Sequence, residues 1–490
     1  MSIYNLGNDR MLCWDDFLIA TQKNIDIQMH HAVPTGDKIT FDNEWDGCCN
    51  GYFHLIQAGD MYYLYYRAMH YTYNADGTVR RSYQKKDPYC IKVSKDGKHW
   101  KNLIINKHEF NGETFNNIFH TEERGLDNFI VGYDRNPNCD PKEKFKALSM
   151  LGVDQPLGHG LALYVSENGF DFTFKRKLAL PGSFDSANLF FWDEEINKYR
   201  IYYRGEHHRV PSDEKFDVEN KSNNIVREVR LAFTDDFETF DIKGELNYID
   251  SDEEQQLYTS GMIKYERAKS TYIGFPMRYM ERWDGEDSFK EMPLARRHEF
   301  MTRLFGREGC VTSDTGIMFS RDGYNFKRFD EAFHTPGIEN RNNWWYGDAT
   351  KCGGLIITES DLEGAPNEYS IFFSENYHIK NPYLVRYTMR FDGFFSWYAK
   401  YKGGEVLTKP FTFEGNELEI NFATSAFSGI DIVLCDEAGN ELDGYKKYNI
   451  FGDSVDRKVH FDKPLKDLEG KPIRIKFTLR DCHLYSFKFN

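Results

Sequence analysis

The chain has 490 residues, of which 77 are acidic and 62 are basic, so its formal net charge is -15 at pH 7. The acidic balance, with no long basic stripe, argues against a nucleic-acid partner. No apolar run is as long as a membrane span, which needs about 18 residues, so we expect no membrane partner. The start lacks a basic stretch followed by an apolar one, and the nine cysteines contain no C-x-x-C pair. Both features favour a cytoplasmic protein with reduced thiols.

Five related turns recur along the chain and predict a repeated architecture. They are SKDGKHW at 94–100, SENGFDF at 166–172, TDDFETF at 234–240, SRDGYNF at 320–326 and RFDGFFSW at 390–397. Each follows a short apolar strand, and a D-G or N-G pair between two strands indicates a β-hairpin. Two further strands precede each turn, so a unit of about 70 residues would hold four antiparallel strands. Five such units predict a five-bladed β-propeller.

The two ends of the chain depart from this period. We expect the N-terminal stretch LCWDDFLIA, residues 12–20, to supply a strand that closes the ring. After about residue 400, short strands separated by E-G and A-G-N turns predict a β-sandwich. The sequence therefore predicts an all-β chain with a propeller over residues 1–399 and a β-sandwich over residues 400–490.

The propeller also predicts where polar side chains should meet. In a four-stranded blade the innermost strand starts at one face beside the central axis, and the second strand returns to that face. The residues that open the first strands are expected at an axial pocket, and they are Asp46, Asp127, Asp185, Tyr258, Trp345 and Asp348. The residues that close the second strands should join them, and they are Arg67, His70, Arg204, Glu206, His207, Arg278 and Glu375.

This collection of side chains suits carbohydrate chemistry. Crowded carboxylates repel one another, which raises the pKa of some and leaves others ionised. Glycoside hydrolysis needs such a split pair, one protonated acid for the leaving oxygen and one carboxylate as base or nucleophile. Arginine and histidine side chains could hold sugar hydroxyls or an acidic group on the substrate. We expect a small-molecule carbohydrate substrate, with no metal and no cofactor, since no metal-ligand spacing stands out.

Two stretches and the repeated turns resemble bacterial proteins grouped with glycoside hydrolase family 32. The stretches are FDSANLFFWDEEINKYRIYYRG at 184–205 and EFNGETFNNI at 109–118. The resemblance implies the five-bladed propeller shared by families 32, 43, 68, 117 and 130. It also implies roles by position: Asp46 as base or nucleophile, Asp127 as the carboxylate that stabilises the transition state, and Asp185 in the place of the general acid. Those families have Glu there, which makes Glu206 a rival for the acid.

Three functions stay open at this point. The first is a glycoside hydrolase acting on small oligosaccharides or glycosides, furanosides included. An invertase-type fructosidase is disfavoured, because residues 43–51 read NEWDGCCNG where family 32 has an Asn-Asp-Pro-Asn-Gly type motif. The second is an inverting phosphorylase that holds phosphate with Arg204, His207 and Arg209. The third is a non-catalytic carbohydrate-binding propeller. Linkage, anomer and self-association through the sandwich also stay open.

Overall fold

The computed structural model describes most of the 490-residue chain. It leaves undescribed residues 1–2, 74–78, 82–86, 122–125, 153–156, 209–224, 251–253, 283–285, 294–308, 341–342, 345 and 378–381. The side chains of residues 71–73, 79–81, 126–127, 208 and 286 are also outside the description.

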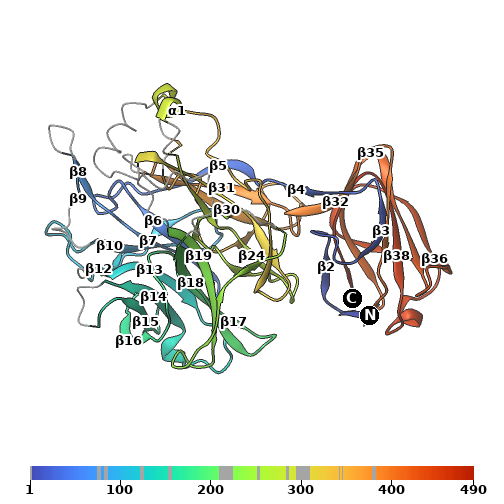
Figure 1. The fold of residues 1–490 in the computed structure, drawn as a ribbon, viewed down its shortest axis with the longest axis horizontal. Coiled ribbons are helices and arrows are strands. Elements are labelled where there is room, and N and C mark those ends of the chain that lie inside the picture. The colour runs from blue at the N-terminus through green and yellow to red at the C-terminus, as the bar shows by residue number, and fades with distance from the viewer. Residues whose placement is uncertain are drawn as a thin grey trace.

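Antiparallel sheets make up the first three blades, five-stranded in blade 1 and four-stranded in blades 2 and 3 (Figure 1). Blade 1 holds β6 (Gly51–Ala58), β7 (Met61–Arg67), β10 (Pro88–Ser94) and β11 (Lys101–Asn102), with β12 (Ile118–Thr121) also on β10. Blade 2 holds β13 (Leu126–Tyr133), β14 (Phe145–Leu151), β15 (Gly160–Ser166) and β16 (Thr173–Leu178). Blade 3 holds β17 (Leu189–Asp193), β18 (Lys198–His208), β19 (Ile225–Thr234) and β20 (Asp241–Glu245).

Blade 4 is divided into two sheets, and blade 5 is completed from the other end of the chain. In blade 4, β22 (Leu257–Thr259), β25 (Met277–Glu281) and β26 (Val311–Thr315) form one sheet. The other sheet of blade 4 holds β23 (Ile263–Lys264), β24 (Tyr272–Gly274), β27 (Met318–Ser320), β28 (Asn325–Arg328) and β21 (Asn247–Tyr248). Blade 5 has the order β29 (Ile356–Thr358), β30 (Glu368–Glu375), β31 (Tyr383–Met389) and β5 (Val33–Thr40).

Apart from these strands, the propeller carries little regular structure in its described part. β8 (Tyr71–Tyr73) and β9 (Val79–Arg81) form a two-stranded ribbon. The short helices are α1 (Glu286–Glu291) and a 3₁₀ turn at Pro141–Glu143. Across the described residues, no helix combines the length and the apolar character needed to cross a membrane.

Four of the five repeated turns are blade hairpins, as predicted. They connect β10 to β11, β15 to β16, β19 to β20 and β27 to β28. In the first, Asp96 Oδ1 accepts from the backbone N–H groups of Lys98 and His99, at 2.9 and 2.8 Å. Asn168, Asp236 and Asp322 accept the equivalent pairs of bonds in the other three turns. These side chains close turns between outer strands, which is a structural task.

The ring is closed by a different N-terminal strand from the one predicted. β5 pairs antiparallel with β31, with Ile39 opposite Leu384, and so supplies the outer strand of blade 5. Residues 12–20 instead belong to the second sheet, where β2 (Arg10–Leu12) pairs with β38 (Arg474–Phe489) and β3 (Ile19–Lys23) pairs with β33 (Gly404–Thr408). The apolar side chains explain the difference, because Cys13 and Leu18 are buried in the core of the sandwich, while Trp14 of the same stretch packs against blades 4 and 5 without adding a strand to them.

The C-terminal sandwich is built from both ends of the chain, and the termini lie side by side in it (Figure 1). Its long strands are β35 (Leu418–Cys435), β36 (Glu441–Ile450), β37 (Asp453–Val459) and β38, with a 3₁₀ turn at Leu465–Leu468. β4 (Asp26–Met29) and β32 (Phe395–Ala399) join the same sheet, while β1 (Tyr4–Gly7) pairs in parallel with β34 (Phe411–Phe413). In its strand pairing, the sandwich therefore crosses the boundary expected at residue 399.

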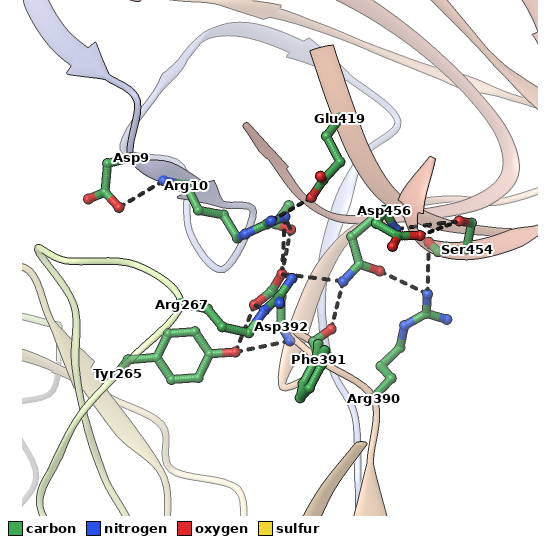
Figure 2. Close-up of polar contacts among 12 residues, drawn as sticks. Asp9, Arg10, Tyr265, Arg267, Arg390, Phe391, Asp392, Glu419, Ser454 and Asp456 are labelled. Atoms are coloured by element: carbon green, nitrogen blue, oxygen red, sulfur yellow. Dashed lines mark hydrogen bonds and ion pairs between the residues drawn. The ribbon is translucent and has the colours of Figure 1, made fainter. Parts of the chain in front are cut away.

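The fifth repeated turn joins the propeller to the sandwich rather than closing a blade hairpin (Figure 2). Its Asp392 is fully buried. Tyr265 and Arg267 donate to this carboxylate from blade 4, at 2.8 and 2.9 Å. Ser486 donates at 2.7 Å and Arg10 lies 3.5 Å away, both from the sandwich. Burial alone would raise the pKa of Asp392, but the two arginines hold it below its usual range.

Aromatic and aliphatic side chains pack between the blades. Each pair of neighbouring blades shares an apolar cluster. Between blades 1 and 2, for example, Tyr65, Phe119, Phe129 and Phe145 are buried in one cluster. Because every blade is fixed on both flanks, the loops around the central axis are held by rigid sheets.

Candidate active site

A narrow cavity of about 80 Å³ lies where the first strands of the blades converge. It is lined by β6 of blade 1, by the chain leading into β17 and β22, and by residues 346–353 before β29. Four tyrosines contribute to its wall, and they are Tyr52, Tyr258, Tyr346 and Tyr377. The Tyr52 and Tyr258 hydroxyls lie 3.2 Å apart, and the ring of Tyr346 meets that of Tyr258 edge-on at 5.8 Å.

The backbone around the axis adopts left-handed conformations in every blade. Tyr52, Asn128, Phe184 and Ala349 have φ of 53°, 57°, 58° and 55°, and Gly261 takes this place in blade 4 with φ of 55°. Non-glycine residues rarely adopt such angles, and they persist where the surrounding structure enforces them. Tyr52 and Asn128 lie at bulges inside β6 and β13, whereas Phe184 and Ala349 lie ahead of β17 and β29. Such conformations near the start of the first strand of each blade mark the axial ends of the blades as a candidate functional site.

Polar groups without partners line this cavity. Asn50 is fully buried, yet among the described residues neither its Oδ1 nor its Nδ2 has a hydrogen-bond partner, and the Thr350 hydroxyl is likewise buried and unpaired there. An unsatisfied buried polar group costs about 1–3 kcal/mol. Folding energy alone does not explain such groups, whereas a polar ligand or water in the cavity would satisfy them.

Asp185 is a carboxylate near two tyrosines of the cavity wall, Tyr52 and Tyr258. It is exposed and follows Phe184, whose strained backbone turns the chain at the opening of blade 3. Its Oδ1 accepts a hydrogen bond from Asn128 Nδ2 at 3.1 Å, and Arg67 Nη1 donates to Asn128 at 3.3 Å. Burial raises the pKa of both Tyr52 and Tyr258, and the charge of Asp185 raises them further. Asp185 therefore acts electrostatically on two tyrosines of the cavity wall.

Asp46 does not line the cavity, although the sequence predicts it there. It is fully buried and its carboxylate closes the turn before blade 1, where Oδ2 accepts from Asn43 N and Nδ2 at 2.9 and 2.7 Å. Tyr66 of β7 donates to Oδ1 at 2.6 Å. Burial raises the pKa of Asp46 in spite of these bonds. The turn directs the Asp46 carboxylate toward Tyr66 of blade 1, so this carboxylate does not lie at the axial pocket where the sequence predicts it.

Glu206 and His207 lie at the end of β18 and also face other surroundings. Glu206 is exposed and lines a separate open cavity with His159 and Arg230. His207 Nδ1 lies 2.6 Å from Glu228 and its Nε2 lies 3.2 Å from Glu254. Burial would lower the pKa of His207, but its bonds to Glu228 and Glu254 raise it.

His207 belongs to a cluster of three side chains that carry potential metal ligands. Ligand atoms of His207, Glu228 and Glu245 lie within 4.8 Å of one another. However, Arg230 Nε already donates to Glu228 Oε1 at 2.5 Å, so a cation would compete with a guanidinium for that carboxylate. Burial and the neighbouring Glu228 raise the pKa of Glu245 to about 7.

Asp348 and Glu375 line a larger neighbouring cavity of about 600 Å³ beside blade 5. Tyr383 donates to Glu375 at 2.9 Å, while Asp348 Oδ1 accepts from the backbone N–H of Tyr377 at 3.3 Å. Because Tyr377 lines the axial cavity, the two cavities adjoin at this residue. The larger one could receive the rest of a substrate whose reacting end lies at the axis.

The remaining predicted residues are dispersed or undescribed. His70 Nε2 bonds to the backbone oxygen of Trp45 at 2.8 Å. The backbone of Asp127 lies in β13, but its side chain is outside the described residues, as is the whole of Trp345. Of the predicted set, the structure thus brings together Arg67, Asp185, Arg204 and Tyr258, with Asp348 next to them.

Sequence reasoning missed several residues of the cavity wall. Asn50, Tyr52, Tyr346 and Lys351 all lie within six residues of a predicted strand opening, in NGYF and in WWYGDATK. A search for carboxylates passes over them. Burial lowers the pKa of Lys351 to about 8, and its Nζ donates to the backbone oxygens of Cys352 and Gly354.

Comparison with known proteins finds similarity only at the level of structure. No protein-family model matches the sequence, and no curated protein matches it. A solved structure described as a glycoside hydrolase is 10% identical and covers 74% of this chain and 92% of its own, with a TM-score of 0.43. The GH32 β-fructofuranosidase of Bombyx mori is 9% identical and covers 94% of each chain, with a TM-score of 0.40. A glycosyl hydrolase from Bacteroides ovatus is 12% identical and covers 77% of this chain and 96% of its own, with a TM-score of 0.39. At such values the likenesses do not decide the activity, which leaves the site itself to carry the functional argument.

Proposed function

We propose that the chain is a glycoside hydrolase that binds the reacting sugar in the axial cavity. The observation that carries this proposal is the fully buried Asn50, whose amide has no partner in a tyrosine-lined cavity beside an exposed carboxylate. A sugar presents hydroxyl groups that both donate and accept, which is what an unpaired amide needs. Tyrosine offers an apolar face for a sugar ring and a hydroxyl for hydrogen bonding.

Asp185 is the catalytic carboxylate in this proposal. Asn128 and Arg67 orient it through the hydrogen bonds described above, so its position does not depend on the substrate. Hydrolysis needs a second carboxyl group: one group protonates the leaving oxygen, and the other activates water or attacks the anomeric carbon. Asp127 remains the sequence candidate for that second group. It directly precedes Asn128, which donates to Asp185.

The test is a screen of aryl glycosides and disaccharides with the full chain, in phosphate-free buffer and with inorganic phosphate added. The proposal expects release of free sugar from at least one glycoside, at a rate that phosphate does not change. Formation of a sugar 1-phosphate only when phosphate is present would identify a phosphorylase instead. Sugar binding without any turnover would identify a carbohydrate-binding propeller.

A further inference from the structure

Three arginines predicted for the pocket differ in their charge partners. Arg67 Nη2 forms an ion pair with Asp87 at 2.8 Å. Arg278 donates to both carboxylate oxygens of Asp314, at 2.6 and 2.7 Å. Arg204, within the described part of the chain, has no carboxylate partner. Two of the three positive charges are therefore neutralised inside the protein, and one is not.

The lack of a carboxylate partner matters because Arg204 is buried. The residue is only 6% exposed, and its Nε is buried without a hydrogen-bond partner. Its side chain donates one hydrogen bond, from Nη1 to the backbone oxygen of Asp185 at 2.8 Å. A guanidinium cannot lose its proton in a protein, and a buried charge is normally paired. The fold therefore holds an uncompensated positive charge in place.

Arg204 also lies next to the proposed catalytic site. Its guanidinium is 5.1 Å from the centre of the Tyr258 ring, which forms part of the cavity wall. Its hydrogen bond reaches the same residue, Asp185, that carries the exposed carboxylate. Among the described residues, Arg227 also lies near that ring, at 5.8 Å, but Arg227 has a carboxylate of its own, Glu281, at 3.9 Å. The positive charge of Arg204 therefore lies against a ring of the cavity wall, beside the residue that carries the exposed carboxylate.

We propose that Arg204 binds an oxyanion, so that the ligand of this site is an acidic sugar carrying a carboxylate or a phosphate group. The planar guanidinium suits either group, because both accept its parallel N–H donors. This inference rests on the proposed function for the place of the site, but it concerns recognition and not the chemical step. It separates this protein from a hydrolase of neutral sugars.

The test measures binding by calorimetry for matched pairs of probes. The pairs are galacturonic acid with galactose and glucuronic acid with glucose, and inorganic phosphate is titrated separately. The full-length chain is compared with Arg204→Gln, with Arg204→Lys, and with Arg135→Gln. Arg135 is an exposed residue that pairs with Glu266, so its variant controls for the loss of one positive charge.

The wild-type chain and Arg135→Gln should bind an acidic probe at least about tenfold more tightly than its neutral partner. Arg204→Gln should abolish that difference, and Arg204→Lys should restore part of it because the charge returns. Preference for a uronic acid identifies a carboxylate ligand, and Arg204-dependent binding of phosphate alone identifies a phosphate ligand. Equal binding of acidic and neutral probes overturns the proposal, as does a preference that Arg204→Gln retains, or no binding of any acidic probe.

This outcome is separable from that of the proposed function. Turnover of a neutral glycoside that is unaffected by Arg204→Gln would overturn the oxyanion proposal and leave the hydrolase standing. Arg204-dependent binding of an acidic probe without turnover of any glycoside would support the oxyanion proposal and overturn the hydrolase.

Discussion

Replacing Asn50 with leucine tests whether the axial cavity is kept for a ligand at the expense of stability. Leucine has nearly the shape of asparagine but no polar atoms. Both side-chain polar atoms of Asn50 are buried without partners, so the folded protein loses no hydrogen bond in this exchange. We expect Asn50→Leu to be more stable than the wild type and to bind sugar more weakly.

The magnitude follows from the desolvation of the amide. Relieving an unsatisfied buried polar group is worth about 1–3 kcal/mol. With an unfolding entropy of about 2.1 cal/mol/K per residue over roughly 400 residues, this corresponds to a rise in Tm of about 1–4 °C. Loss of the hydrogen bonds to a sugar hydroxyl should weaken binding by about tenfold.

Asn117→Leu is the matched control. Asn117 is also fully buried, but its Oδ1 accepts from Trp45 Nε1 at 2.6 Å and its Nδ2 donates to the backbone oxygen of Ile91 at 2.8 Å. Its replacement should lower stability by about 1–3 kcal/mol, because both partners are left unpaired. Differential scanning calorimetry gives the order of the three Tm values, and turnover of the best glycoside from the screen gives function. A lower Tm for Asn50→Leu than for the wild type, or unchanged turnover, would refute the reasoning.

Three further predictions concern residues away from the cavity. Asp46→Asn should reduce the free energy of unfolding by about 1–3 kcal/mol, seen as a lower urea midpoint, because the Asp46 oxygens accept three hydrogen bonds within the fold. The kcat per folded molecule should stay unchanged, and a large fall in kcat at unchanged stability would make Asp46 catalytic. Asp392→Asn should destabilise the chain by about 3–5 kcal/mol, because the half-buried Arg267 loses its carboxylate partner and the buried Arg10 loses one of its two, and an unchanged urea midpoint would count against this. The raised pKa of Glu245, about 7 in the fold against 4.5, means that its stabilising contribution is present at low pH and is lost as pH rises through 7. Glu245→Gln should therefore gain stability over the wild type as pH increases from 5 to 8, by on the order of 1 kcal/mol after allowance for solvent screening, and a gain that shrinks with pH would contradict the assignment.

The blade pattern could be predicted because it is local. Each turn such as Ser94–Trp100 encodes its own hairpin through an Asp or Asn side chain that binds backbone groups two and three residues on. The pattern failed at Asp392, where the same local signal serves a contact between modules. The fifth turn differs locally, because Arg390 stands where the four hairpin turns have a Ser or Thr whose hydroxyl accepts from a backbone N–H. The partners Arg10 and Arg267, however, are distant in sequence and could not be predicted from the turn.

Side-chain placement in the site was less predictable, because it depends on partners that are distant in sequence. That Asp185 opens blade 3 follows from the order of strands, and the structure places it beside the cavity. Asp46 occupies the equivalent place in blade 1, but its orientation depends on Tyr66 in the next strand. Likewise, sequence does not reveal that Arg278 has a carboxylate partner and Arg204 has none, because the pairing depends on strand register. Which N-terminal strand closes the ring depends on the burial of Cys13 and Leu18 in the sandwich core. Much of that core is formed by residues more than 380 positions later in the sequence.

The most direct test of the central claim is the turnover of Asp185→Asn on a glycoside that the wild-type chain cleaves. Asp171→Asn is the control, because Asp171 is an exposed carboxylate in a blade hairpin, bonded to Lys107. If Asp185 is the catalytic carboxylate of an axial active site, kcat should fall at least about 100-fold in Asp185→Asn and stay unchanged in Asp171→Asn. A kcat for Asp185→Asn equal to that of the wild type would show that the chemistry, if any, is carried out elsewhere.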